Sequence, residues 1–337
     1  MYFSEDDSAY VMSNVVARLG GLGDDRIMLG SIVDIEKIPS GWAVLDGINR
    51  QVVFLDDDLN PMRTVGGPGD GPGEFQAPGQ LATVGDTIAV LEMGSGGRMT
   101  YLGPQGDFLR VSGHVGHPVM SVAIHPDLGR FFPILSREHY LVRDTEKEGS
   151  RRIARIPAAF VPEIEGSAGL AGMTPNLVAV TADGAAHVLD GEHLALVSFN
   201  PDEDHAGLIA LLPREMRDRK LRERSEAGST LGGHEVLTTQ TVMRLDALAD
   251  GRLFASVRYG TSRGYVLNPA SLTATSIDLA LVDWPDEWQV WSFVLYFDGK
   301  NLILAGGITP ELVLATTELV PRTHLAPVER YKRLGNR

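Results

Sequence analysis

Residues 66–75 read Gly-Gly-Pro-Gly-Asp-Gly-Pro-Gly-Glu-Phe, and this stretch joins two segments that have the same order of strands and turns. Before it, apolar runs at 42–46 and 51–56 are separated by a Gly- and Asn-containing turn. After it, runs at 87–92 and 99–102 are separated by a second Gly-rich turn. Short apolar runs separated by Gly, Asn and Asp are typical of β-strands joined by tight hairpins. The chain is therefore predicted to consist of repeated β-strand units, two of which residues 66–75 connect.

The junction resembles the motif GxGxGPGEF of a bacterial family of six-bladed β-propellers, which is related to NHL-repeat proteins. In this sequence the match is Gly-Pro-Gly-Asp-Gly-Pro-Gly-Glu-Phe at 67–75, and the resemblance extends over residues 31–113. It implies an all-β fold, a six-bladed β-propeller in which four-stranded blades surround a central channel. Because propellers carry many unrelated functions, the resemblance implies a fold but no reaction.

Units of about 40 to 50 residues, the range of propeller blades, continue along the rest of the chain. Six blades in a single domain are predicted, at residues 31–66, 79–113, 118–157, 175–213, 240–280 and 289–320. The last unit has only three clear strands, and residues 10–18 are predicted to supply its fourth. An N-terminal strand in that place would close the ring and remove the open sheet edges.

The junction could also be considered as a phosphate-binding loop. That interpretation fails because neither Gly-Lys-Ser/Thr nor an amphipathic helix follows it. Instead, we expect Phe75 to fill the interface between the first two blades and Glu74 to accept hydrogen bonds from nearby backbone amides.

One helix is expected, at residues 213–227 in a connection between two blades. Pro213 suits the first helical position, and acidic residues precede arginines at i,i+4 spacing, as in Glu215 and Arg219. The helix is nearly polar all round, so it is interpreted as a solvated surface element. The alternative is a mobile lid whose basic residues attract an anionic ligand.

The composition restricts partners and chemistry. The 337 residues include no cysteine, which excludes disulfides, thiolate metal ligands and a cysteine nucleophile. The net charge of −14 repels phosphate backbones, so nucleic acid is not an expected partner. No apolar run approaches the roughly 20 residues that cross a bilayer. No cofactor is predicted, and the composition is compatible with a monomer.

The first residues are acidic and do not have the pattern of a secretory signal peptide. As written, the chain is expected in the cytoplasm. The alternative is an exported protein whose signal segment has been removed, because relatives of this type are often exported or lipid-anchored.

Candidate acid–base residues occur in the connections between blades, which gather on one face of a propeller and form its usual binding surface. His117, His234 and Glu235 are the candidate catalytic residues, because His and Glu side chains can carry protons near neutral pH. His114 shares a connection with His117 and is a candidate ligand contact. The alternative for each histidine is a solvated loop side chain.

Three of the four tryptophans, Trp284, Trp288 and Trp291, fall within eight residues at the entrance to the last inner strand. Indole rings at a channel mouth can stack on an aromatic, cationic or sugar ligand. They can equally seal the contact between the last and first blades. Gln80, Asn176 and Gln240 begin inner strands and are further candidate ligand contacts in the channel.

The predicted function is binding of a small molecule or peptide at the channel mouth. Calcium-dependent six-bladed lactonases are similar in design, but a hard cation needs several converging oxygens. Here Asp34 is the one obvious channel carboxylate, so no metal is predicted. The alternative is a metal-independent enzyme of lyase, cyclase or hydrolase type that uses the His and Glu residues above. A serine nucleophile is unsupported, because no Gly-x-Ser-x-Gly motif accompanies them.

Overall fold

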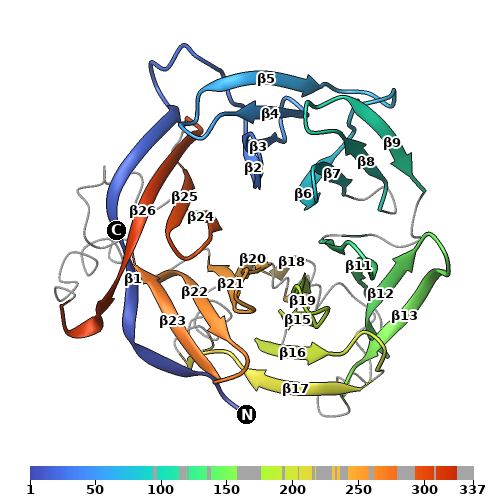
Figure 1. Ribbon diagram of the computed structural model, residues 1–337, viewed down its shortest axis with the longest axis vertical. Helices are drawn as coiled ribbons and strands as arrows, with labels where there is room; N and C mark the ends of the chain where they lie inside the picture. Colours follow the sequence, from blue (N-terminus) through green and yellow to red (C-terminus); the bar gives the residue numbers. More distant parts are fainter. Residues whose placement is uncertain are drawn as a thin grey trace.

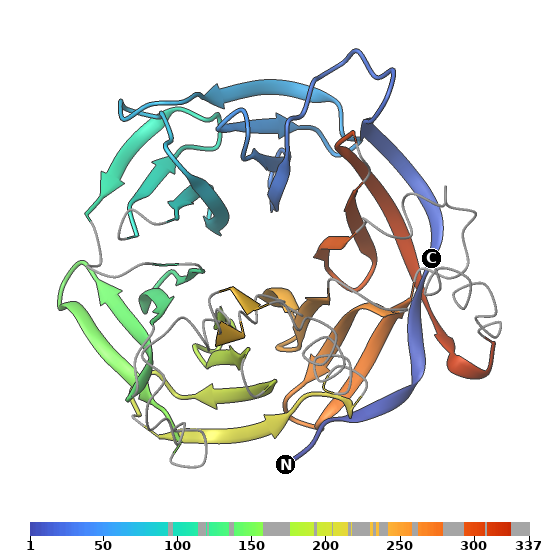
Figure 2. The same cartoon turned by 180° about the vertical axis from the view of Figure 1, so that it is seen from behind.

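The structure is a computed structural model, and the residues it describes form a ring of β-sheets around a central axis (Figures 1 and 2). The described residues are 1–93, 97–113, 119, 121–134, 138–157, 176–191, 194–203, 205–214, 217, 230–231, 234–235, 242–257, 262–278, 293–306 and 309–324. Within them, the elements are strands β1–β26 and one short 3-10 helix, η2 (Arg322–His324). No helix in this part of the chain is long and apolar enough to cross a membrane.

Four of the sheets have four strands each, which follow one another in chain order and pair antiparallel. They are β2–β5 (Ile32–Ile38, Gly41–Asp46, Gln51–Leu55, Pro61–Gly66), β6–β9 (Pro78–Val84, Thr87–Glu92, Met99–Leu102, Phe108–Ser112), β10–β13 (Ala123–His125, Gly129–Pro133, His139–Thr145, Gly149–Arg155) and β14–β17 (Leu177–Val180, Ala186–Asp190, Ala195–Phe199, Ala206–Leu211). In each sheet the first strand lies toward the channel and the last on the outside (Figure 1).

The remaining part of the ring is one eight-stranded sheet in the order β20-β21-β22-β23-β1-β26-β25-β24. Its strands are β20–β23 (Val242–Ala247, Leu253–Val257, Ser262–Asn268, Thr273–Asp278), β24–β26 (Phe293–Phe297, Asn301–Gly306, Glu311–Pro321) and β1 (Ser4–Gly20). A separate two-stranded sheet contains β18 (Thr230–Leu231) and β19 (His234–Glu235).

The N-terminal strand β1 occupies the seam of this eight-stranded sheet. It pairs antiparallel with β26, with Tyr10 opposite Leu319 and Arg18 opposite Val313, so the predicted pairing of residues 10–18 with the end of the chain is confirmed. It also pairs parallel with β23, which the sequence did not indicate. Before β1 begins, Phe3 donates its backbone N–H to Leu211 at the end of β17 over 2.9 Å. The N-terminal segment therefore contacts β17, β23 and β26, which belong to three neighbouring parts of the ring.

Strand burial explains why the repeats could be recognised. The second strand of each four-stranded sheet contains a run of buried apolar residues, and all six residues of β3 are buried because neighbouring sheets cover both of its faces. The outermost strands are more exposed than the second strands, and most residues of β5 and β9 face solvent. Radial sheets packed face to face around a channel are the architecture of a β-propeller.

The junction at 66–75 has the roles predicted from its sequence. Phe75 is fully buried in the apolar cluster between the first two sheets, together with Leu45 and Leu81. A Cβ atom on Gly66 would lie 2.5 Å from the Phe75 ring, and Gly66 has a φ of 110°, so only glycine is compatible there. Glu74 accepts a hydrogen bond from the backbone N–H of Gly71 over 2.9 Å, as expected for a capping carboxylate.

Buried carboxylates at the ends of two second strands fix the connections between sheets. Asp46, the last residue of β3, accepts hydrogen bonds from the backbone N–H groups of Gly30 and Ser31 at 2.8 and 3.0 Å. Glu92, the last residue of β7, accepts one from Gln76 at 2.9 Å and pairs with Arg98. Each carboxylate satisfies amides that would otherwise be unpaired where the chain enters an inner strand.

Candidate functional site

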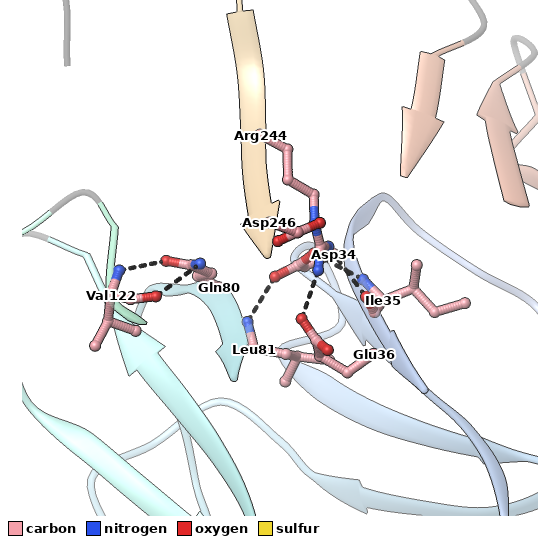
Figure 3. A network of polar contacts seen from close by, with 8 residues as sticks. All are labelled: Asp34, Ile35, Glu36, Gln80, Leu81, Val122, Arg244 and Asp246. Carbon is pink, nitrogen blue, oxygen red and sulfur yellow. Dashed lines mark hydrogen bonds and ion pairs between the residues drawn. The ribbon is translucent and has the colours of Figure 1, made fainter. Parts of the chain in front are cut away.

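Four charged side chains from two inner strands meet on the axis of the ring. Asp34 and Glu36 are two residues apart on β2, and Arg244 and Asp246 are two residues apart on β20. Residues i and i+2 of a β-strand point to the same face. Both pairs therefore point toward the channel, where Figure 3 shows them together. We call these four residues the axial cluster.

Arg244 is the centre of the axial cluster. Its Nη1 donates to Asp34 Oδ1 and, over 3.0 Å, to the carbonyl oxygen of Ile35. Its Nη2 donates to Glu36 Oε1 over 2.5 Å, and its Nε donates to Asp246 Oδ2. These bonds use four of the five N–H groups of the guanidinium. The Arg244 side chain is only 10% exposed, so it is held as an internal counterion.

Backbone amides extend the axial cluster to the neighbouring sheets. Asp34 Oδ2 accepts a hydrogen bond from the N–H of Leu81 on β6 over 2.7 Å. Beside it, the Gln80 side chain accepts from the N–H of Val122 over 2.7 Å and donates to its carbonyl oxygen over 3.2 Å. Figure 3 shows both groups of bonds, which the backbone connects because Gln80 and Leu81 are adjacent on β6. The network joins inner strands that lie far apart in the sequence, since Asp34 and Arg244 are separated by 210 positions.

The charges of the axial cluster do not balance, because three carboxylates surround one guanidinium. Burial raises the pKa of Asp34 and of Glu36, and the attraction of Arg244 offsets only part of this effect. Burial alone would lower the pKa of Arg244, but the three carboxylates outweigh it and raise that pKa well above its ordinary value. Arg244 is therefore always charged, while Glu36 and Asp34 hold protons more readily than exposed carboxyl groups.

Two cavities lie on the axis, one on each side of Arg244. The larger has a volume of about 320 Å³ and is lined by later residues of the inner strands. Each inner strand contributes at least one residue to the lining of this cavity, including Glu36, Thr83, Ile124, Val180, Asp246 and Tyr296. The smaller, of about 90 Å³, is lined near the beginnings of the same strands, by residues including Asp34, Gln80, Ser121, Leu177, Met243 and Leu295. Arg244 lines both, so the axial cluster separates them.

The structure places only some of the residues predicted from the sequence. Gln80 lines both cavities, as expected for a channel residue. Asn176 is half-buried and its side-chain oxygen accepts a hydrogen bond from the N–H of Gly191 over 3.3 Å, beside β15. His234 and Glu235 form β19, but their side chains lie outside the description. The other predicted site residues also lie outside the described residues: His114, His117, Gln240, Trp284, Trp288 and Trp291. The predicted helix at 213–227 is almost entirely outside them as well.

Sequence reasoning named Asp34 but missed Glu36, Arg244 and Asp246. The available signal was a pair of charged residues at i and i+2 in each of two mostly apolar inner strands. In the described part of the chain, no group of three or more His, Asp or Glu residues is arranged to hold a metal ion. The carboxylates of the axial cluster converge on a guanidinium instead.

Comparisons with known proteins agree with the fold. No family model and no curated protein sequence matches the chain. Among solved structures, a DUF4221 family member from Bacteroides vulgatus is similar with a TM-score of 0.57 at 12% identity, over 94% of this chain and all of that one. A protein of unknown function from Bacteroides thetaiotaomicron has a TM-score of 0.57 at 12% identity, over 92% of this chain and 76% of that one. Virginiamycin B lyase from Staphylococcus aureus has a TM-score of 0.50 at 10% identity, over 92% and 99%. At these identities the likeness shows the β-propeller fold alone.

Proposed function

We propose that this protein binds a small molecule in the larger axial cavity, among the later residues of the inner strands. The observation that carries the proposal is the convergence of all the inner strands on one cavity of about 320 Å³. Ligand sites in proteins are concave, have volumes of about 300 to 1,000 Å³, and combine apolar walls with a few placed polar groups. This cavity combines aliphatic side chains with Glu36, Asp246 and Tyr296.

Two carboxylate oxygens in this cavity are available to a ligand. Glu36 uses Oε1 and Asp246 uses Oδ2 to bind Arg244, and no described residue donates to the second oxygen of either. Arg244 fixes both carboxylates in place, so their free oxygens do not have to be ordered when a ligand binds. Such preorganised groups favour a small, specifically oriented molecule. A peptide fits a cavity of this volume less well.

The proposal treats the ring as a single domain of six blades. The support is the eight-stranded sheet, which can be divided into β20–β23 and a second set of four, β24–β26 with β1. With the four separate sheets this makes six sets of four strands. The Gly-Pro-Gly-Asp-Gly-Pro-Gly-Glu-Phe junction at 67–75 supports kinship with the bacterial NHL-like propellers.

The sequence-derived contacts at the blade connections remain part of the proposal. His114, Trp284, Trp288, Trp291 and Gln240 would extend a binding surface at the start of the inner strands, where Gln80 lines the smaller cavity. The helix at 213–227 would decorate the same face. With a net charge of −14, the chain is expected to prefer small molecules over nucleic acid.

The second candidate is a metal-independent acid–base enzyme. One observation favours it: Glu36, whose pKa burial raises, lies beside Asp246 in a cavity, and a pair of carboxyl groups in different environments can divide acid and base roles. One propeller with this architecture is named as a lyase. In this version Glu36 and Asp246 are the acid–base pair in the larger cavity, and His117, His234 and Glu235 are further proposed proton carriers in the blade connections.

A cavity-filling variant tests the binding proposal. Thr83→Trp, which would place an indole in the cavity, is compared with Thr64→Trp on the exposed outer strand β5. A library of small metabolites is screened by thermal shift against wild type and both variants. Ligands of this site should stabilise wild type and the Thr64 variant but not the Thr83 variant, because bound ligand stabilises only the form that can take it up. Equal shifts in all three proteins would reject the site.

A further inference from the structure

We infer that the ligand of the larger axial cavity is a small organic cation, such as a primary ammonium compound, and that anions are excluded. The inference rests on the proposed function, since it assigns a charge class to the ligand of that same cavity. It depends on which polar atoms of the axial cluster are already used and which are free, and on the volume of the cavity into which the free atoms open.

Arg244 has only one N–H group left with which to bind an anion. Its side chain is the one cationic group in the described lining of the cavity, yet four of its five N–H groups already bind Asp34, Ile35, Glu36 and Asp246. An incoming carboxylate or phosphate would compete with three fixed carboxylates for the remaining N–H. It would also enter a region where negative charge exceeds positive charge, which costs free energy at low dielectric.

A cation, in contrast, could bind carboxylate oxygens that no described residue uses. The free Oε2 of Glu36 and Oδ1 of Asp246 are acceptors held by one guanidinium, and Glu36 is only 18% exposed. Bonds between an ammonium group and carboxylates are short and are about twice as strong as neutral ones. Binding of one positive charge would bring the charge of the axial cluster closer to balance. Partial burial would protect these bonds from screening by salt.

Tyr296 provides an aromatic wall and a further polar group. Its ring packs edge to face against Trp42 with centroids 4.9 Å apart, which fixes its orientation in the lining. Its hydroxyl donates to Asp298 over 3.4 Å, and Asp298 also accepts N–H groups from Lys300 and Asn301. Asp298 is therefore occupied within its turn, and among the carboxylates of the described lining the oxygens to which no described residue donates are Glu36 Oε2 and Asp246 Oδ1. An aromatic face beside carboxylates suits an ammonium ion.

Three probes of similar shape and different charge test the inference. Phenethylammonium, 2-phenylethanol and 3-phenylpropionate are titrated into the full-length protein at pH 9 by calorimetry and by ligand-observed NMR. Burial raises the pKa of Glu36 to about 8, so at this pH its carboxyl group is largely ionised. We expect the cation to bind at least tenfold more tightly than the alcohol, and the carboxylate to show no binding. In Glu36→Gln the preference for the cation should fall about tenfold or more, as expected for loss of a charge-assisted bond.

Glu318→Gln is the matched control, because it removes the same charge from an exposed position on β26. It should leave all three affinities unchanged. If the alcohol or carboxylate binds as tightly as the cation, and Thr83→Trp abolishes that binding, the site exists and the inferred charge class is wrong. If none of the probes binds in a way that Thr83→Trp abolishes, this inference is rejected, and the metabolite screen with Thr83→Trp and Thr64→Trp decides separately whether the cavity is a ligand site.

Discussion

At the scale of single residues, the fold depends on Arg244 as an internal counterion. Replacement by Met would leave Asp34, Glu36 and Asp246 facing one another without a cation. Removal of one partner of a buried ion pair costs about 3–5 kcal/mol, because the remaining charge is buried and uncompensated. We therefore expect Arg244→Met to lower the free energy of unfolding in urea by about this amount.

The control for this residue is Arg18→Met. Arg18 is 44% exposed and pairs with Glu311 across 3.1 Å at the surface, where ion pairs contribute about 1 kcal/mol or less. A second variant, Arg244→Met with Asp34→Asn, should recover part of the loss because it removes one of the unpaired charges. Equal losses for Arg18→Met and Arg244→Met would show that Arg244 does not have this role.

At the scale of elements, β1 holds the ring closed by pairing with both β23 and β26. Tyr10 is 7% exposed, packs edge to face against Phe297 with centroids 4.9 Å apart, and accepts a hydrogen bond from Arg252 over 3.1 Å. Tyr10→Ala should cost about 3–5 kcal/mol, as for other buried aromatic residues. Backbone amides of both β23 and β26 should then exchange hydrogen faster. As a control, Tyr2 is 65% exposed, and Tyr2→Ala should cost less than about 1 kcal/mol. Faster exchange in only one of the two strands would contradict a shared seam.

At the scale of the whole molecule, burial of carboxyl groups on the axis makes stability depend on pH. The folded-state pKa values of Asp34 and Glu36 lie above their ordinary values of 3.8 and 4.5, because burial outweighs the attraction of Arg244. The folded protein therefore binds more protons than the unfolded chain in this range, and this contribution to stability is lost as pH rises from about 4.5 toward the raised pKa values. Asp246 and Tyr296 line the same cavity and face the same charged groups.

Urea unfolding between pH 5 and 8 should show a smaller loss of stability with rising pH for Glu36→Gln than for wild type. Parallel curves for the two proteins would contradict the assignment.

The sequence by itself determined the strands, their turns and much of their assembly. The second strand of each four-stranded sheet contains a short run of buried apolar residues, as in β3, and these runs made the repeat visible. The roles of Phe75 and Glu74 were predictable because contacts within a short junction depend on local chain geometry. The pairing of β1 with β26 could be predicted because the last unit lacked one strand.

Only the tertiary structure decided the candidate site and the second partner of β1. Two charged residues at i and i+2 of a short strand can equally well face solvent. The pairs on β2 and β20 therefore did not by themselves indicate a buried cluster. Closure of the ring turns both pairs inward and brings Asp34 and Arg244 together across 210 positions. Their long-range ion pairs, and the cavities on either side, are properties of the closed ring, because no single repeat contains both halves of the cluster.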